Sequence, residues 1–357
     1  MNEPIAQPAP PGSVLILKPS SLGDVVSAVP VLRGLKRSLP SARVSWLLNR
    51  QCAPLLAGDA DLDEIILFDR KLLGRAWRSP SAARSLAKLL RHLRKTRFDW
   101  VIDLQGLLRS GLLSAATLAP LRAGFSDARE GAWLFYNRRI DVGQPHTVDR
   151  NIELARQLGI DARPEDMTLS ISAEGQTFAE QFCRANSLKN KGFLLCVPPT
   201  RWATKLYPVR HWRSVVLAML PRLPVVLIGT LADRQLCQEV AEGLPATVIN
   251  AAGTTSVPQL VALIAAAAGV VCGDSAAQFI APAVGTDVVT LMGPTRPERT
   301  GPYRRGRAVV SPVGCQGCLR DRCRHRTCME MIDPAAVVQA ATAMLDLPAT
   351  PPACPGD

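Results

Sequence analysis

Short apolar runs alternate along the chain with longer segments in which apolar positions recur at the period of a helix. In the first half, the runs predict buried strands over residues 14–17, 44–48, 64–68 and 100–104. Helical periodicity predicts helices over residues 25–39 and 84–97. Because strands and helices alternate, the pattern indicates a parallel sheet flanked by helices.

The same alternation begins again after residue 190. Here the runs predict strands over residues 192–197, 225–228, 270–272 and 288–291, and helices over 209–220 and 259–268. The chain is therefore expected to form two successive α/β domains. We place the first at residues 13–170, a linker at 171–190, the second at 191–332 and a C-terminal helix at 333–346. The Pro-rich ends, 1–12 and 347–357, are expected to be disordered.

Length and composition agree with two globular domains. The chain has 357 residues, of which 47% are hydrophobic, so it can bury a sizeable core. Its 42 Lys and Arg residues outnumber its 30 Asp and Glu residues. The resulting charge of +12 suggests an anionic partner: nucleic acid, a phosphorylated small molecule or an acidic membrane face. Aromatic residues make up only 5%, which argues against binding to single-stranded nucleic acid.

Neither a secretory signal nor a membrane-spanning segment is visible in the sequence. The first twelve residues lack an apolar core. The longest apolar run, 261–272, is shorter than the roughly 20 residues that cross a bilayer. We therefore expect a cytoplasmic protein. Its ten cysteines are then expected to be thiols or metal ligands rather than disulfides.

Two loops of the first half follow predicted strands, which is where doubly wound sheets bind ligands. Residues 18–24, KPSSLGD, lead into a helix whose N-terminus favours anions. Asp24 is a candidate functional carboxylate there, and a helix-capping role is the alternative. In the second loop, Asp103, Gln105 and Arg109 are candidates to point into the same crevice as Asp24. A capped strand-to-helix turn is the alternative for that loop.

Loops of the second half carry groups suited to phosphate and sugar. Thr200, Arg201, Thr204 and Lys205 follow a predicted strand, and their hydroxyls and cations can bind phosphate. In residues 273–279, GDSAAQF, small residues leave backbone N–H groups open to a phosphate at a helix start. Asp274 can accept hydrogen bonds from sugar hydroxyls, with an N-cap role as the alternative. Residues 293–297, GPTRP, form a rigid loop at the same rim.

These segments together resemble the family 9 glycosyltransferases, the lipopolysaccharide heptosyltransferases. The matching motifs, in the family's order and spacing, are VLILKPSSLGD (14–24), VIDLQGLLRSG (101–111), LFYNRR (134–139), TKLYPVRHW (204–212), GDSAAQF (273–279) and GPTRP (293–297). The stretch around LFYNRR looks closest to heptosyltransferase I, which adds the first heptose to Kdo. The resemblance, over residues 14–345, implies a GT-B fold: two Rossmann-like, doubly wound domains facing across a cleft. The amino half would bind the acceptor and the carboxyl half the nucleotide sugar.

The resemblance also implies a reaction and a role for each motif residue. The expected reaction moves heptose from ADP-L-glycero-β-D-manno-heptose to the Kdo or inner core of lipopolysaccharide, with inversion and without a catalytic metal. Asp24 takes the position of the general base, and the expected acceptor-binding residues are Ser20, Ser21, Gly23, Asp103, Gln105 and Arg109. Asp233 is expected at the ribose, Thr255 near the adenine and Asp274 at the sugar. The remaining expected donor ligands are Thr200, Arg201, Thr204, Lys205, Ser275 and Ala276.

Three positions depart from the family pattern. Ala276 stands where relatives often have Gly, and Ala is small enough for the backbone to approach a phosphate. Phe279 stands where relatives often have a His, and this removes a polar contact available to donor or acceptor. Tyr207 stands where the family's KxWP-like motif has Trp.

The positive charge is concentrated in the first half. Residues 70–98 contain ten Lys or Arg and no acid, and residues 1–150 carry 22 Lys or Arg against 13 acids, a net +9. A solvated helix face explains this pattern without a partner. The resemblance favours a second interpretation, because an acceptor of Kdo and lipid A lies on an anionic leaflet. On that interpretation the protein associates peripherally with the cytoplasmic face of the inner membrane.

Four cysteines form a separate dense cluster: Cys315, Cys318, Cys323 and Cys328, with His325 between them. Four thiolates within fourteen residues can close a tetrahedral site, most simply with a structural zinc ion. Free thiols and disulfides are the alternatives. The position of the cluster after the last motif argues against a catalytic role.

The alternatives to this function fall into three classes. Within family 9, the alternatives are a later core heptose, a protein acceptor or another nucleotide sugar. A dinucleotide-dependent oxidoreductase is disfavoured, because no predicted strand is followed by GxGxxG. A nucleic-acid-binding module is disfavoured by the low aromatic content and by the absence of helix-turn-helix or C2H2 spacing.

Overall fold

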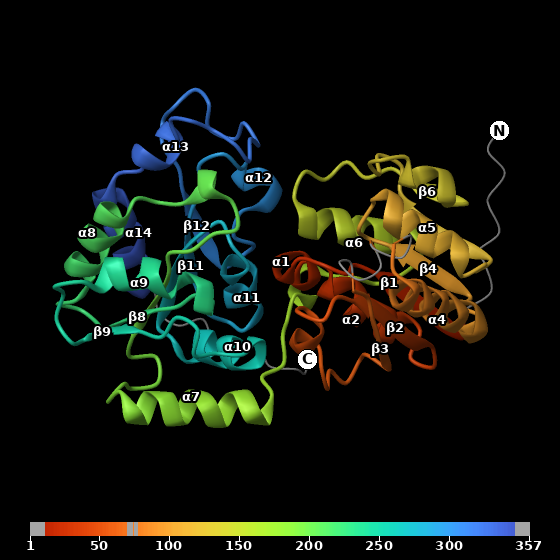
Figure 1. The fold of residues 1–357 in the computed structure, drawn as a ribbon, viewed down its shortest axis with the longest axis horizontal. Helices are drawn as coiled ribbons and strands as arrows, with labels where there is room; N and C mark the ends of the chain where they lie inside the picture. Colours follow the sequence, from red (N-terminus) through yellow and green to blue (C-terminus); the bar gives the residue numbers. More distant parts are fainter. Residues whose placement is uncertain (1–10, 70–73, 75–77, 347–357) are drawn as a thin grey trace. The chain divides into compact units, whose positions relative to one another are not determined.

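The computed structural model describes residues 11–69, 74 and 78–346. The chain divides into two compact units, Met1–Met167 and Thr168–Asp357 (Figure 1). The ends expected to be disordered lie almost entirely outside the described residues, as does part of the basic stretch 70–98. No helix among the residues described is both long and apolar enough to span a bilayer.

The first unit is built on a six-stranded parallel sheet in the order β3-β2-β1-β4-β5-β6. Its central strands are buried apolar runs, as expected for strands covered on both faces. Val14 of β1 pairs with Val44 on one side and Trp100 on the other, so the strand order reverses beside β1. The strands are β1 (Ser13–Leu17), β2 (Arg43–Leu48), β3 (Glu64–Leu67), β4 (Trp100–Asp103), β5 (Leu121–Phe125) and β6 (Arg138–Ile140).

The helices of the first unit differ from the prediction at two places. The helix expected over residues 25–39 is two helices, because Pro30 at the start of the second has no N–H to continue the first. The basic helix begins at Pro80, where the Ser79 hydroxyl accepts a hydrogen bond from the Ala82 N–H. The helices are α1 (Leu22–Val26), α2 (Val29–Ser38), α4 (Pro80–Thr96), α5 (Leu108–Ala116) and α6 (Thr147–Gln157), with short 3-10 turns η1 (Ala53–Leu55), η2 (Ala132–Phe135) and η3 (Pro164–Asp166).

The second unit repeats this plan with the order β12-β11-β10-β7-β8-β9. In each unit the first strand lies between the second and the fourth, which is the doubly wound Rossmann order. The strands are β7 (Leu194–Val197), β8 (Val225–Leu227), β9 (Val248–Asn250), β10 (Gly269–Gly273), β11 (Val288–Leu291) and β12 (Gly306–Val309). The helices and turns are α7 (Ala173–Ala185), η4 (Ala203–Lys205), α8 (Val209–Met219), η5 (Leu231–Asp233), α9 (Arg234–Ala241), α10 (Val257–Ala266), α11 (Ala277–Ala283), α12 (Pro297–Thr300), α13 (Thr327–Glu330) and α14 (Pro334–Leu345).

The segment 171–190, expected as a linker, contains helix α7 and belongs to the second unit. A Cβ atom on Gly175 would lie 2.7 Å from the Pro258 carbonyl oxygen, so α7 packs directly on α10 (Figure 1). The Leu169 N–H also donates to the Ala283 carbonyl. The chain therefore enters the second unit at residue 168, and α14 closes that unit by packing on α8, β10 and β11.

Candidate functional site

The loop after β1 holds Asp24 in place through Ser21. Oδ2 of Asp24 accepts hydrogen bonds of 2.8 Å from both the Ser21 N–H and the Ser21 hydroxyl. This arrangement caps the N-terminus of α1. The helix-capping role, which is the alternative for Asp24, is therefore present in the structure. The carboxylate nevertheless stays partly exposed, as does Ser20, whereas Gly23 is buried. Capping and a second function are therefore compatible at Asp24.

Lys18 is a buried cation beside this loop, and no sequence motif predicts a role for it. Its Nζ donates a 2.6 Å hydrogen bond to the Leu104 carbonyl, which links the loops after β1 and β4. Burial lowers the pKa of Lys18, and the charges of Asp24 and Asp103 oppose that shift. The sequence signal for this residue is a lysine directly after a buried apolar strand.

Asp103 organises the loop after β4 from inside the protein. Its Oδ1 accepts from the Gln105 and Gly106 N–H groups, at 2.9 and 3.1 Å, and its Oδ2 accepts from the Tyr136 hydroxyl at 2.6 Å. The side chain is fully buried, and burial raises its pKa. Asp103 therefore forms a capped turn and has no surface for an acceptor to contact. Arg109 is exposed, and Gln105 is partly buried with an Oε1 atom that has no partner.

In the second unit, four side chains gather at the carboxyl end of β10. Asp274 Oδ2 accepts from Lys205 Nζ at 2.7 Å and from the Thr295 hydroxyl at 2.5 Å, and its Oδ1 accepts from Gln278 Nε2 at 2.6 Å. The exposed fractions of the Lys205 and Asp274 side chains are 14% and 9%. The sequence assigned Lys205 to phosphate and Asp274 to sugar, whereas the structure pairs them with each other. We call these four residues the Asp274 cluster.

The surroundings of the Asp274 cluster leave polar atoms without partners. Among the described residues, Ser275 Oγ and Gln278 Oε1 are buried and have no hydrogen-bond partner. Lys205 Nζ lies 4.3 Å from the centre of the Trp202 ring. These groups provide a cation and unsatisfied polar atoms at one strand end, which suits an anionic polar ligand.

The remaining donor candidates have different surroundings. Arg201 is exposed, Thr255 is partly exposed, and the Thr200 hydroxyl donates to the Trp202 carbonyl at 3.0 Å. Asp233 accepts from the Thr230 N–H and hydroxyl, at 2.8 and 2.5 Å, and so caps η5. Ala276 is the residue before α11. Thr204 is buried and donates to the Arg320 carbonyl at 3.1 Å, so its hydroxyl is directed away from a phosphate role.

Phe279, which the resemblance marks as a departure from the family pattern, is buried within α11. It belongs to the apolar interior of the second unit.

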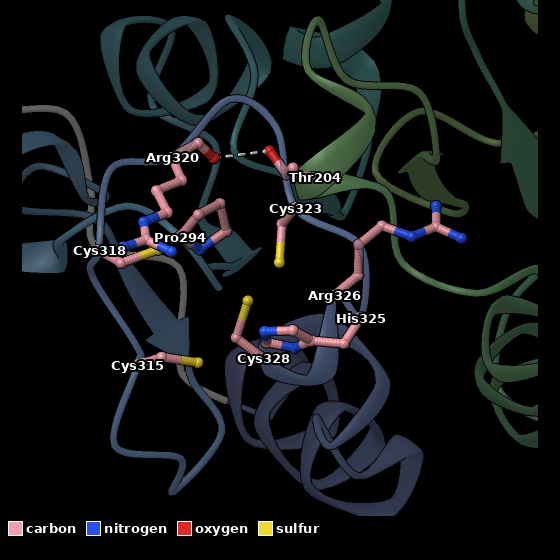
Figure 2. Close-up of a pocket in the computed structure, with 9 residues that line it drawn as sticks. All are labelled: Thr204, Pro294, Cys315, Cys318, Arg320, Cys323, His325, Arg326 and Cys328. Atoms are coloured by element: carbon pink, nitrogen blue, oxygen red, sulfur yellow. Dashed lines mark hydrogen bonds between the residues drawn. The ribbon is translucent and has the colours of Figure 1, made fainter.

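The four clustered cysteines line one cavity of about 260 Å³ (Figure 2). The sulfur atoms of Cys323 and Cys328 point toward each other, and the His325 ring lies beside Cys328 (Figure 2). Burial and the neighbouring cysteines raise the pKa of Cys328, whereas backbone N–H groups lower that of Cys323. All nine cysteines that the structure describes are free.

The predicted zinc site is not formed by these side chains as they are placed. Across residues 11–69, 74 and 78–346, no three His, Cys, Asp or Glu side chains are grouped so that they can hold a metal ion. The backbone before α13 is irregular and Cys328 lies on α13, so the spacing of the cysteines does not by itself bring the sulfurs around one point.

This cysteine segment is tied to both loops that form the Asp274 cluster. Gln316 Nε2 donates to the Thr295 carbonyl at 3.1 Å, and the Gly317 N–H donates to the Gly293 carbonyl at 2.9 Å. The Thr204 bond to Arg320 joins it to the loop of Lys205. The segment therefore holds the loops of Lys205 and Thr295 in place through hydrogen bonds.

Comparison with known proteins identifies the family. The model described as glycosyltransferase family 9 (heptosyltransferase) matches residues 86–329. The lipopolysaccharide core heptosyltransferase OpsX of Haemophilus influenzae is 31% identical, covering 84% of this chain and 84% of its own. The chain belongs to glycosyltransferase family 9.

Two further proteins are similar to this glycosyltransferase over nearly its whole length. Lipopolysaccharide heptosyltransferase 1 of Pseudomonas aeruginosa is 28% identical over 94% of this chain and 99% of its own. The structure of E. coli heptosyltransferase WaaC with ADP-2-deoxy-2-fluoro heptose is 25% identical, with a TM-score of 0.73, covering 93% of this chain and 99% of that chain. The predicted family, enzyme class and GT-B fold are therefore confirmed.

Proposed function

We propose that this glycosyltransferase moves heptose from ADP-L-glycero-β-D-manno-heptose to Kdo of the lipopolysaccharide inner core. The observation that carries the proposal is the Asp274 cluster at the carboxyl end of β10, where doubly wound sheets bind ligands. The names of the relatives support heptose as the sugar and lipopolysaccharide as the acceptor class.

The donor binds the second unit in this proposal. Lys205 and the exposed Arg201 supply positive charge to the diphosphate as negative charge develops on the leaving ADP. Asp274, Ser275 and the backbone at Ala276 face the sugar and phosphates. Asp233 binds the ribose, Thr255 lies near the adenine, and Thr200 shapes the phosphate loop.

The acceptor binds the first unit, with Asp24 as its base. An inverting transfer requires a base on the acceptor hydroxyl, on the side opposite the departing nucleotide. Ser21 orients the Asp24 carboxylate through Oδ2 and leaves it partly exposed. Arg109 is an exposed cation that can bind an acceptor carboxylate, and the partly exposed Ser20 and Gln105 supply polar groups from the loops after β1 and β4.

The same acceptor places the enzyme at the cytoplasmic face of the inner membrane. Helix α4 presents exposed Arg and Lys side chains and contains no acid. Basic residues near an anionic surface contribute about 1 kcal/mol each to membrane binding. Equal sedimentation with neutral and with anionic vesicles would contradict this electrostatic attraction.

The deciding experiment is transfer from ADP-heptose to Kdo-bearing lipid A, followed by the mass of the acceptor. We expect a gain of one heptose, and we expect it to persist in excess EDTA because Lys205 and Arg201 supply the charge at the diphosphate. The Asp24→Asn variant is expected to bind ADP normally and to lose transfer by at least about 100-fold. Asp161→Asn, an exposed ion-pair residue of the first unit, is the matched control.

Other outcomes separate the parts of the proposal. Near-normal transfer by Asp24→Asn would reject Asp24 as the base. Binding of ADP without transfer would retain the donor site and point to another acceptor, such as a later core heptose or a protein. Failure to bind ADP would point to another nucleotide sugar.

A further inference from the structure

Exposed apolar side chains gather on two adjoining elements of the first unit, α5 and η2. Leu108 and Leu112 are four residues apart on α5, so they share one face of that helix. Trp133 and Leu134 are the exposed residues of η2. Leu112 and Leu134 keep 48% and 61% of their surface exposed, which is a large fraction for leucines with neighbours of the same kind. We call these four residues the apolar patch.

Close packing makes the apolar patch continuous. A Cβ atom on Gly111, between the two leucines, would lie 2.9 Å from the Phe135 ring and 3.1 Å from the Ala132 Cα. The absence of a side chain at Gly111 therefore lets η2 rest against α5. Contiguous exposed apolar surface of this kind marks an interaction site, whereas single exposed leucines do not.

Cations border the apolar patch. The Arg139 guanidinium lies 4.7 Å from the centre of the Trp133 ring, and its Nε donates to the Trp133 carbonyl at 3.0 Å. Arg109 and Arg129 are exposed beside Leu108 and η2. Arg94 of the basic helix α4 donates to the Ala116 carbonyl at the end of α5, at 3.2 Å. Two acids lie on the loop before η2: Glu130 accepts a hydrogen bond from the Leu108 N–H, and Asp127 is paired with Arg150.

The apolar patch lies at the same edge of the sheet as Asp24. Leu108 and Trp133 follow the carboxyl ends of β4 and β5, and Asp24 follows that of β1, which is parallel to them. The Arg129 N–H donates to the Gly106 carbonyl, and Lys18 donates to the Leu104 carbonyl, so these loops are linked. A molecule held by the apolar patch is therefore next to the loop of the candidate base.

We propose that the apolar patch inserts into the anionic lipid surface that carries the acceptor, with the bordering arginines on lipid phosphates. This inference rests on the proposed function, which supplies a lipid-linked acceptor. Trp, Leu and Arg together are the side chains of interfacial membrane-binding elements, in which the apolar groups enter the acyl region and the cations remain at the headgroups. Positive charge alone would hold the protein above the lipid, whereas the apolar patch fixes which edge of the unit faces it.

The test uses the full chain and vesicles of phosphatidylcholine with phosphatidylglycerol. The Leu112→Ser/Leu134→Ser double variant is expected to bind these vesicles about tenfold more weakly than the native chain, because two partly inserted leucines are lost. Leu217→Ser/Leu231→Ser, at exposed leucines of the second unit, is the matched control and is expected to bind normally. Tryptophan fluorescence is expected to shift to the blue on vesicle binding, and Trp133→Phe is expected to remove that shift.

Transfer assays separate this inference from the proposed function. The double variant is expected to lose transfer to acceptor in vesicles and to keep transfer to a Kdo acceptor without acyl chains, which also shows that it folds. Native vesicle binding by the double variant, or an equal loss in the control variant, would overturn the inference and leave the proposed function standing. Vesicle binding that depends on the apolar patch, in a native chain that transfers no heptose, would overturn the proposed function alone.

Discussion

Lys205 illustrates how one residue can serve both the fold and the reaction. Its ammonium group neutralises Asp274, which keeps only 9% of its side chain exposed and also accepts from Thr295 and Gln278. We expect Lys205→Met to weaken ADP binding about tenfold and to slow transfer about 100-fold, because the charge that meets the diphosphate is lost. Isothermal titration with ADP and the transfer assay measure the two effects. Lys189→Met, an exposed Lys of the same unit, is the control, and unchanged ADP affinity in Lys205→Met would contradict the role.

The sequence predicts where single residues lie along the fold, and it does not predict their hydrogen-bond or ion-pair partners. Asp274 directly follows β10, whereas Asp24 lies on α1 after β1 and Lys205 lies on η4 after β7, in the chain order that the predicted strands indicate. The partner of Lys205 lies 69 residues away, and that of Asp103 is Tyr136, 33 residues away. Periodicity carries no information on such contacts, so it could not show that Lys205 and Asp274 pair or that Asp103 is buried.

At the scale of elements, the cysteine segment 315–328 has contacts that the sequence does not reveal. The sequence predicts a structural zinc site, which the described side chains are not grouped to form, and the segment also bonds to the loops of Lys205 and Thr295. We expect Thr204→Val to raise the KM for the donor about fivefold with a smaller effect on kcat, because one hydrogen bond to that segment is worth about 1 kcal/mol. Steady-state kinetics with varied ADP-heptose measure this. Thr177→Val removes a similar hydroxyl-to-carbonyl bond on α7, and an equal effect there would contradict the role of the segment.

Apolar runs in the sequence predicted the buried central strands. They did not predict polar edge strands or a helix that is held by tertiary packing. Central strands such as β1, β4 and β7 each contain a run of at least three buried apolar residues, so they are visible in the sequence. The edge strands β6 and β12 read RRI and GRAV, so no apolar run reveals them in the sequence. The sequence predicts a linker where α7 lies, because the contacts that hold this helix are made with the distant helix α10.

At the scale of the whole molecule, each unit has a hydrophobic core of its own, and this has a consequence for unfolding. One core is centred on residues such as Leu15, Leu47 and Phe98, and the other on Trp212, Met219 and Val271. We expect calorimetry to show two unfolding transitions, one for each unit. ADP is expected to raise the transition temperature of the second unit only, because a ligand stabilises the unit that it binds. Leu47→Ala is expected to destabilise the first unit by about 2–5 kcal/mol and so to lower the other transition alone. Val271→Ala is the converse control, expected to lower the transition that ADP raises. A single transition that moves as a whole with ADP and with both variants would mean that the two units unfold as one.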